Sequence, residues 1–282
     1  MLAQYLIGVD YKPYPKSFYH LYSLKSLVRL RDVLVRQRSN YLIRLTNVLD
    51  YIFPEFKPFF DNKFSVTALY ILNNYGSPES ISKMNSCSYD ILRRKSHGNF
   101  TIDKFAKLKL LAKNTVGQWN EIYELELETL LKLYGEMDIK VDKLENEIIK
   151  IVTEINPPTL SIRGIGPLSA AAIVSEFGDI RRFSSSDKML SFAGLEPGHF
   201  QSGTSEYTGH MVKHGSSILR YTIMNCANTA FLHNEVFAAY YYKKRSEGKT
   251  HRVALNHVAK KLLRIIYTLE TKKILFDSSK LR

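Results

Sequence analysis

The sequence predicts a mainly α-helical protein in two consecutive parts, and three observations lead to this prediction. Apolar residues recur at three- and four-residue steps from Ser23 to about Ile52 and again from about Gly117 to Ile155, as in helices that bury one face. Asn156-Pro157-Pro158 then ends the pattern, because consecutive prolines cannot continue a helix. Beyond these prolines the chain is richer in glycine. We therefore expect a helical, coiled-coil-like region over residues 1–155 and a glycine-loop-rich α-helical domain over residues 156–282.

The first predicted helix, Ser23 to Ile52, combines a leucine-rich face with a basic one. Arginines fill much of the surface that the leucines leave: Arg29, Arg31, Arg36, Arg38 and Arg44. Such a face could contact nucleic-acid phosphates, or it could be a solvated surface whose arginine stems cover apolar atoms. Phe53-Pro54 ends the helix and shorter helices follow. One of them should begin at Ser77-Pro78, because serine is a favourable N-cap and proline a favourable first helical residue.

The second long helix, from about Gly117 to Ile155, carries a regular apolar seam, and we expect a break near Gly135. The seam consists of residues three or four positions apart: Met137, Val141, Leu144, Ile148, Val152 and Ile155. This spacing is close to a heptad repeat and predicts an antiparallel or intermolecular helical pair. Ordinary bundle packing of the same seam is the alternative.

The composition indicates a folded protein with a polyanionic partner. Hydrophobic residues make up 45% and aromatic residues 12% of the chain, which excludes a disordered protein. Lys and Arg number 40 against 27 Asp and Glu, a formal net charge of +13. Nucleic acid is the first candidate partner because binding releases counterions from phosphates, and an anionic membrane surface is the rival. No apolar run reaches the roughly 20 residues of a membrane span, so we expect no membrane insertion.

The two cysteines indicate neither a metal site nor a disulfide scaffold. Cys87 and Cys226 are far apart in sequence and stand in no paired or histidine-rich motif. This usage fits a reducing cytoplasm.

A glycine hairpin is predicted at Gly164-Ile165-Gly166. Glycine permits positive φ and exposes backbone N–H groups, and Pro167 is suited to open the small-residue helix that runs to Phe177. The pattern resembles a helix-hairpin-helix, in which a glycine turn and a helix N-terminus bind a phosphate without reading sequence. We therefore predict DNA-phosphate contacts from Arg163, Gly164 and Gly166. A plain turn without a ligand is the alternative.

Ser202 is the candidate nucleophile. It stands before Gly203, which would let other backbone groups come close, in a stretch broken by several glycines. Lys213, His214 and Arg220 follow, and cations near a serine hydroxyl can lower its pKa or balance charge on a pentavalent phosphate. The alternative is that Ser202 only caps a turn or a helix.

The final predicted helices are rich in tyrosine and basic residues. Tyr240-Tyr241-Tyr242 precedes Lys243, Lys244 and Arg245, and a later helix exposes Lys260 and Lys261 beside an apolar face. Aromatic rings among cations can stack on bases and hold phosphates, so we predict DNA binding here. Alternatively, the tyrosines pack in the core and the lysines are merely solvated.

Taken together, GIGPLSAAAIVSEFGDIRRF, QSG, KHGSSILR and YYYKKRSEGKTHRVALNHVAKKLLRIIYTL resemble the carboxy-terminal domain of insertion-sequence-110-type transposases, relatives of the Piv and MooV recombinases. The resemblance spans about Leu160 to Glu270 with the same order and spacing, and it extends less distinctively to Ser23–Ser39 and Phe53–Phe56. It departs slightly at Gly215-Ser216, where the family commonly has Gly-Asn.

The resemblance implies a DNA transposase or site-specific recombinase of a mobile insertion sequence, with Ser202 as the matching nucleophile. In the family, a RuvC-like nuclease domain supplies four acidic residues that hold a divalent metal, Mg. A structured guide (bridge) RNA chooses target and donor DNA. We accordingly expect DNA as the partner, a guide RNA as a further one, a homo-oligomer (dimer or tetramer), and a prokaryotic, nucleoid-associated location.

The nuclease core is expected to be missing from this chain. Ile7-Gly8-Val9-Asp10 looks like the family's first acidic strand, but prolines and an arginine-rich helix follow where alternating strands should. Asp32, Asp50 and Asp61 are no better placed as metal ligands. We therefore expect no metal site here and a truncated or degenerate transposase. Three functions stay open: an incomplete serine recombinase, a nucleic-acid-binding module without catalysis, and a helical protein whose heptad-like segment oligomerises.

Overall fold

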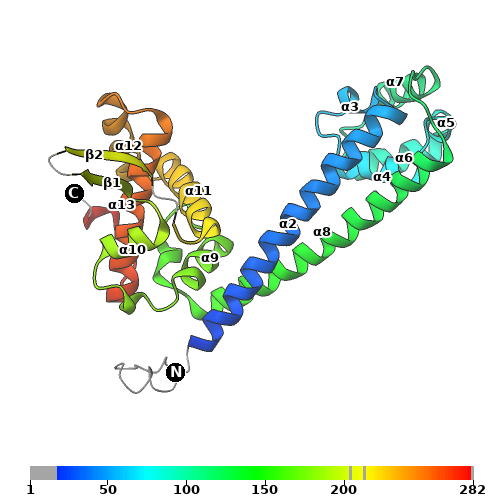
Figure 1. Ribbon diagram of the computed structural model, residues 1–282. Coiled ribbons are helices and arrows are strands. Elements are labelled where there is room, and N and C mark those ends of the chain that lie inside the picture. Colours follow the sequence, from blue (N-terminus) through cyan, green and yellow to red (C-terminus); the bar gives the residue numbers. More distant parts are fainter. Residues whose placement is uncertain (1–17, 203–204, 212–213, 281–282) are drawn as a thin grey trace, which may run out of the picture. The chain divides into compact units, whose positions relative to one another are not determined.

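The computed structural model describes residues 18–202, 205–211 and 214–280, and it defines only the backbone for residues 18–20, 197–202 and 205–211 (Figure 1). The chain is mainly α-helical, which confirms the predicted class. In chain order the elements are α2 (Phe18–Ile52), α3 (Phe56–Phe59), α4 (Val66–Tyr75), α5 (Pro78–Ser82), α6 (Ser86–Lys95), α7 (Ile102–Lys113), α8 (Glu121–Ile155), η1 (Pro158–Ser161), α9 (Pro167–Phe177), η2 (Ile180–Arg182), α10 (Ser186–Ala193), β1 (Pro197–Ser202), β2 (Ser205–Met211), α11 (Ser217–His233), α12 (Glu235–Ser246), α13 (His251–Lys272) and η3 (Ser278–Lys280).

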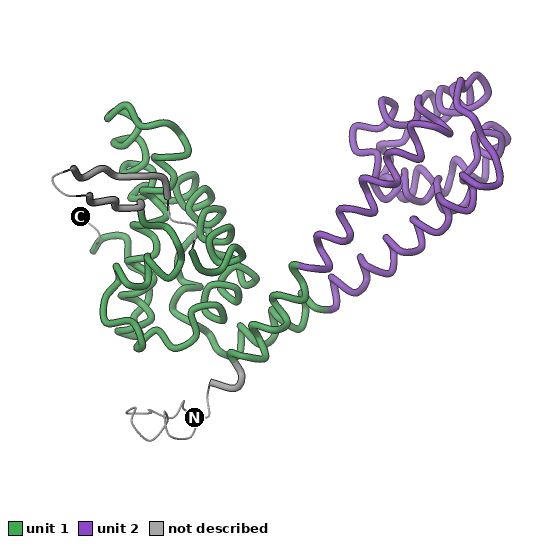
Figure 2. Tube along the Cα trace, viewed as in Figure 1, with its two compact units in different colours: residues 1–32, 144–282 green, residues 33–143 purple. Residues whose placement is uncertain are grey.

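The chain divides into two compact units (Figure 2). The small unit comprises residues 33–143, and the large unit comprises residues 1–32 and 144–282. The predicted boundary at residues 155 and 156 therefore falls inside the large unit. The physical reason is packing: Leu24 and Val28 of α2 and Ile148 and Val152 of α8 are buried in the same core as the later helices.

Helices α2 and α8 pair antiparallel within the chain. In the large unit the Arg31 guanidinium donates to Glu145, with Nε 2.8 Å from Oε1. In the small unit Arg38, seven residues later on α2, pairs at 2.6 Å with Asp138, seven residues earlier on α8. The predicted partner of the apolar seam is thus a helix of the same chain, whereas the supercoiling of a coiled coil stays a prediction.

Helix α8 is continuous, so the break expected near Gly135 is wrong. One glycine in a helix interior costs only about 1 kcal/mol relative to alanine. Buried residues on both sides of it, Leu131 and Val141, lie in the cores of the structure and hold the helix in place. Packing therefore outweighs the local preference.

The small unit is built around the end of α2. Its core includes Leu45, Leu49, Ile52, Phe53, Phe56, Ile71, Leu72, Leu108, Leu127 and Leu131. Polar caps begin its short helices, and Ser77 before Pro78 caps α5 by accepting a hydrogen bond from the Ser80 N–H, as predicted. The linker into α8 crosses the end of α2 so closely that a β-carbon on Gly117 would lie 2.2 Å from the Ile52 carbonyl oxygen.

The large unit packs α10, α11 and α12 around α13, whose inner face is apolar from Ala254 to Leu269, and α9 packs on α11. Two buried carboxylates tie its parts together. Glu270 accepts hydrogen bonds from the Thr159 backbone N–H (3.0 Å) and hydroxyl (2.7 Å). Glu176 at the end of α9 receives the guanidinium of Arg29, with Nε 2.8 Å from Oε1.

Strands β1 and β2 form an antiparallel pair where the sequence predicts a glycine-rich loop between helices. Ser202 pairs with Ser205, and Phe200 with Tyr207. A glycine between two short runs that contain aromatic residues and threonine is typical of a hairpin, and this signal was available in the sequence. Elsewhere, none of the helices within the described ranges combines the length and apolar character that a membrane span requires.

Candidate nucleic-acid interface

The glycine hairpin lies between η1 and α9 and has one packed and one open side. The turn is closed by a hydrogen bond from the Ile165 N–H to the Ile162 carbonyl (3.0 Å), and Gly164 has a φ of 102°. A β-carbon on Gly164 would lie 3.1 Å from the Ala230 nitrogen of α11, so close packing requires this glycine. Gly166 is the N-cap of α9 and has open space where a β-carbon would lie. The predicted helix after the hairpin is present, but a 3-10 turn precedes it, and the helix-hairpin-helix assignment stays a prediction.

Arg163 lies on the open side of the hairpin, beside a cleft of about 610 Å³. His233 and Asn234, at the junction of α11 and α12, line the same cleft, as do the carboxylates of Glu235 and Asp277. These two acidic residues reduce the positive potential around Arg163. The hairpin therefore offers an exposed arginine and glycine, but in mixed electrostatic surroundings.

A stronger concentration of positive charge lies where α12 packs on α13. The ring of Tyr240 holds the ammonium group of Lys261 4.9 Å from its centroid and that of Lys244 5.7 Å away. Lys244 also donates to Glu247 at 2.8 Å, and this hydrogen bond raises the Lys244 pKa. Lys243 and Arg245 are on the same helix. The structure thus brings the predicted tyrosine and lysines of this region together.

Further basic residues on α13 extend this region: His257, Lys260 and Arg264, the last of which pairs with Asp187 at 2.9 Å. We call Lys244, His257, Lys260, Lys261 and Arg264 the α12–α13 cationic surface. Sequence reasoning missed His257, although its spacing of three, four and seven residues from the three later cations predicts a shared helix face.

Burial and mutual repulsion lower the pKa of several of these groups. Burial lowers the pKa of Lys260, and the charge of Arg264 adds to the effect. Burial also lowers the pKa of Lys261. The pKa of His257 is lowered by burial first and then by the charges of Lys244, Lys260 and Lys249. Positive charges that repel one another gain from an anion placed among them, which is the electrostatic condition for binding phosphate.

The loop before α11 is anchored by glycine and arginine. Gly215 has a φ of 83°, and a β-carbon there would lie 2.1 Å from the Phe192 carbonyl oxygen. Arg220 donates from Nη1 to the carbonyls of His214 (3.1 Å) and Ala193 (3.5 Å), so its guanidinium holds the loop. His214 itself is exposed.

The remaining predicted catalytic groups fall outside what the structure describes. Ser202 is placed by its backbone, as the last residue of β1, while its side chain lies outside the described atoms. Lys213 lies outside the described residues altogether, as does Asp10, which the sequence does not favour as a catalytic acid. The catalytic grouping of Ser202 with Lys213 and His214 therefore stays a prediction.

The carboxylates, histidines and cysteines of the described chain do not form the metal site that the family resemblance implies. Within residues 18–202, 205–211 and 214–280, no three of these side chains gather closely enough to hold a metal ion. Asp50 instead pairs with Lys57 at 3.4 Å. The described donor set therefore does not fit the divalent metal.

Comparison with known proteins gives a consistent picture. Residues 159–242 match the family described as "Transposase IS116/IS110/IS902 family". The chain is 23% identical over 271 residues, 95% of its length and 68% of the relative, to the "Insertion element IS116 uncharacterized 44.8 kDa protein" of Streptomyces clavuligerus. It is 28% identical over 115 residues, 41% of its length, to the "Insertion element IS110 uncharacterized 43.6 kDa protein" of Streptomyces coelicolor, covering 28% of that relative. It is 32% identical over 68 residues, 24% of its length, to a "Probable family 20 transposase" of Pseudomonas aeruginosa, covering 20% of that relative.

Proposed function

This chain is a relative of the insertion-sequence-110-type transposases, and on that premise we propose that its large unit binds DNA and offers Ser202 as the nucleophile of strand transfer. The family match includes the glycine hairpin, Ser202, the anchored loop before α11 and the first residues of α12. The observation that supports DNA binding best is the α12–α13 cationic surface. Two of its lysines, Lys244 on α12 and Lys261 on α13, lie over the Tyr240 ring, so these two are held in place before a ligand arrives.

The proposed binding mode is contact with the sugar-phosphate backbone. Lysine ammonium groups are point charges that suit phosphate oxygens, whereas sequence reading needs planar donors directed at base edges. The Tyr240 ring orients Lys244 and Lys261, and Lys260 and Arg264 extend the charge along α13. This surface therefore supplies affinity, and base selection is left to other parts of the complete assembly.

The proposed chemistry at Ser202 is a transesterification. The hydroxyl oxygen attacks a DNA phosphorus, a new phosphoserine ester forms, and the bond to one DNA oxygen breaks. The hydroxyl proton leaves as the ester forms, and the departing DNA oxygen gains a proton. Charge accumulates on the other phosphate oxygens in the transition state, and we propose that Lys213 and His214, which follow Ser202 in the sequence, stabilise it.

DNA binding is tested by the salt dependence of duplex affinity. Removing one phosphate-binding cation lowers the slope of log affinity against log salt by about 0.9, so Lys260→Ala together with Lys261→Ala should lower it by nearly 2. Lys272→Ala, an exposed change on the last turn of the same helix, is the matched control and should leave the slope unchanged. The DNA-binding part of the proposal is refuted if the wild-type chain binds duplex DNA no more tightly than it binds an anionic dextran.

The nucleophile is tested separately by trapping a covalent protein–DNA adduct. We expect an adduct with DNA that carries the ends of the element, supplemented with Mg²⁺ and with a full-length relative where the chain alone does not react. Ser202→Ala should abolish the adduct while duplex binding persists. Undiminished binding with no adduct under any of these conditions would favour the second candidate, a nucleic-acid-binding module without catalysis.

A guide RNA and self-association are the remaining expectations from the resemblance. The basic charge suits RNA as well as DNA, so the same titrations with a structured RNA encoded beside the gene test the first. Light scattering of the chain with and without DNA tests the second, against the expectation of a dimer or tetramer.

A further inference from the structure

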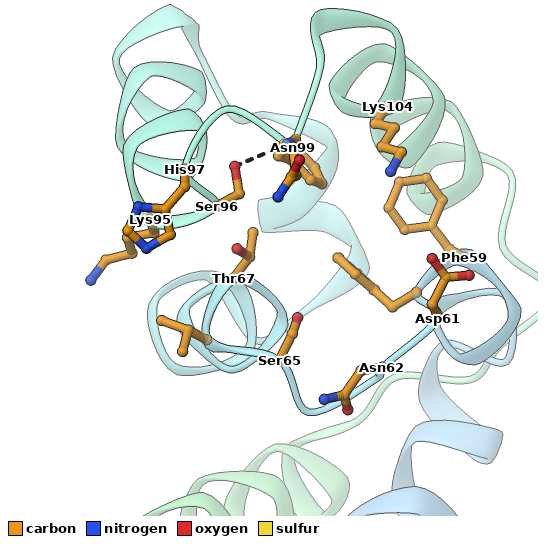
Figure 3. Close-up of a pocket in the computed structure, with 13 residues that line it drawn as sticks. Phe59, Asp61, Asn62, Ser65, Thr67, Lys95, Ser96, His97, Asn99 and Lys104 are labelled. Atoms are coloured by element: carbon orange, nitrogen blue, oxygen red, sulfur yellow. Dashed lines mark hydrogen bonds between the residues drawn. The ribbon is translucent and has the colours of Figure 1, made fainter.

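The small unit contains a pocket of about 340 Å³ that lies outside the residues matched by the transposase family. Three segments form it: the loop from Phe59 to Asn62, the first turn of α4, and the connection from Lys95 to Lys104 between α6 and α7 (Figure 3). A volume of this size suits a ligand of roughly one nucleotide. The chemistry of its walls indicates which ligand.

One wall of the pocket is aromatic. Phe60 and Phe100 are stacked with their centroids 6.2 Å apart and their planes inclined by 14°. Phe59 meets Phe100 edge-on at 6.3 Å and Phe60 at 4.8 Å. Phe59 and Phe60 are only half-buried, so they present ring surface to the pocket. Such a wall suits a flat, conjugated ring system.

The opposite side of the pocket is polar and neutral. Figure 3 shows the Asn99 amide pointing toward the pocket from the connection after α6, with Ser65 and Thr67 across from it at the start of α4. The first N–H groups of an α-helix such as α4 have no acceptor within the helix, and the Ser65 hydroxyl accepts from Ala68. Amide, hydroxyl and N–H groups placed opposite a flat wall can pair with the edge of a nucleobase. Asp61, which lies beside Phe59 in Figure 3, adds a charged acceptor suited to an exocyclic amino group.

The rim of the pocket is cationic and leads into a second hollow. Lys104 lies over the Phe59 side of the pocket in Figure 3. His97 lines both this pocket and a neighbouring hollow of about 460 Å³, whose other residues are Asp90, Arg93, Arg94 and Gly98. Between residues 57 and 113 the sequence has ten Lys and Arg but four Asp and Glu. A ligand that uses both hollows therefore carries more than one negative charge.

We propose that this pocket takes one unpaired base of a single-stranded nucleic acid, whose phosphates continue across the Arg93–Arg94 hollow. Stacking on the phenylalanines supplies affinity without regard to sequence, and the polar side orients the base edge. A free nucleotide would leave the second hollow empty, which favours a strand. This inference goes beyond the proposed function, because it concerns the small unit and needs neither Ser202 nor the α12–α13 cationic surface.

The test measures the affinity of the whole chain for fluorescently labelled single strands of about ten nucleotides, a length within the usual range of such sites. Each strand is prepared as DNA and as RNA, with its bases intact or with an abasic site at every position. We expect the abasic strands to bind at least fivefold more weakly, because they cannot stack on the phenylalanines. The DNA and RNA arms identify the natural source of the strand.

Three variants locate the effect. Asn99→Ala should weaken binding of intact strands about fivefold to tenfold and leave abasic strands unchanged, because it removes only the interaction with the base. Arg93→Ala with Arg94→Ala should weaken both kinds of strand. Lys113→Ala, an exposed change at the far end of α7, is the control and should change neither.

One further variant separates binding from folding. His97 has a φ of 50°, a backbone conformation that glycine adopts without strain. His97→Gly should therefore keep or raise the thermal stability of the small unit while weakening strand binding at least threefold. The proposal is overturned if Asn99→Ala affects intact and abasic strands equally, or if free uridine monophosphate binds as tightly as the strand. Either result leaves duplex binding by the large unit untouched, so the two proposals fail separately.

Discussion

The ion pair between Arg29 and Glu176 joins the start of α2 to the end of α9, and its removal should specifically destabilise the large unit. Two hydrogen bonds join the groups, at 2.8 and 3.1 Å, and the Glu176 side chain is 1% exposed. Arg29→Ala leaves a buried carboxylate with Lys25 alone, 3.3 Å away.

The expected magnitude follows from this geometry. Leaving a fully buried charge without its partner costs about 3–5 kcal/mol. The Arg29 side chain is 53% exposed and Lys25 remains, so solvent and the second cation reduce this to about 2 kcal/mol. For a unit of this size, the melting temperature should fall by about 4–8 °C. Arg29→Ala combined with Glu176→Leu should recover part of the stability, because no unpaired charge is then buried.

The single tryptophan, Trp119, provides the assay, because it packs against the core of the small unit. Its fluorescence reports unfolding of that unit, whereas far-ultraviolet circular dichroism reports the helices of both. Arg29→Ala should lower the dichroism transition and leave the tryptophan transition in place. Equal shifts of both transitions would refute the division into units, and no shift would refute the role of the ion pair.

The same pair predicts a pH dependence. Burial raises the pKa of Glu176, but the hydrogen bond from Arg29 and the charges of Lys25 and Arg29 outweigh it, so the pKa is lowered overall. A lowered folded pKa means that the stabilisation is complete above the ordinary glutamate pKa and is lost as the pH falls through the folded one. Glu176→Gln should therefore flatten the decline in large-unit stability in acid.

Three further predictions follow from other contacts. Gly117→Ala should destabilise the small unit by about 2–4 kcal/mol, measured by tryptophan fluorescence in urea, because the β-carbon would lie 2.2 Å from a backbone oxygen of α2. Thr159→Val should lower the free energy of unfolding of the large unit by about 1–3 kcal/mol, measured by thermal unfolding, because it removes the 2.7 Å hydrogen bond from the hydroxyl to buried Glu270. The control Thr153→Val, at an exposed position of α8, should lower it less. The lowered pKa of His257 should rise when duplex DNA binds, because phosphate offsets the neighbouring lysine charges. DNA affinity should then increase as the pH falls through the bound-state pKa and level off below the free-state pKa of His257. A proton NMR titration with no change on adding DNA would exclude His257 from the interface.

Much of the local structure was predictable because local rules govern it. The apolar period placed α2 and most of α8, Ser77-Pro78 placed the start of α5, and Pro167 placed the start of α9. The strands β1 and β2 were not predicted, because glycine is depleted in strands and favours loops.

The candidate interface was predictable only in part. Lys244 and Lys261 were found from the interleaving of tyrosines and cations, and the structure brings both onto the Tyr240 ring. The sequence predicts Gly164 as a hairpin residue. Its close approach to α11 depends on a segment more than sixty residues away, so the local sequence could not predict it. The roles of Ser202 and Lys213 rest on the resemblance and stay predictions.

The sequence by itself determined the helical class, the basic charge and the relation to the transposases, because periodicity, composition and motif order are properties of the chain alone. The tertiary structure decided which helix covers the seam of α8, where the compact units divide, and which carboxylates are buried. Periodicity states that a helix has an apolar face but not what covers it, and a burial such as that of Glu176 exists only once α2 and α9 meet. The aromatic pocket of the small unit arises in the same way, from three segments that only the fold brings together.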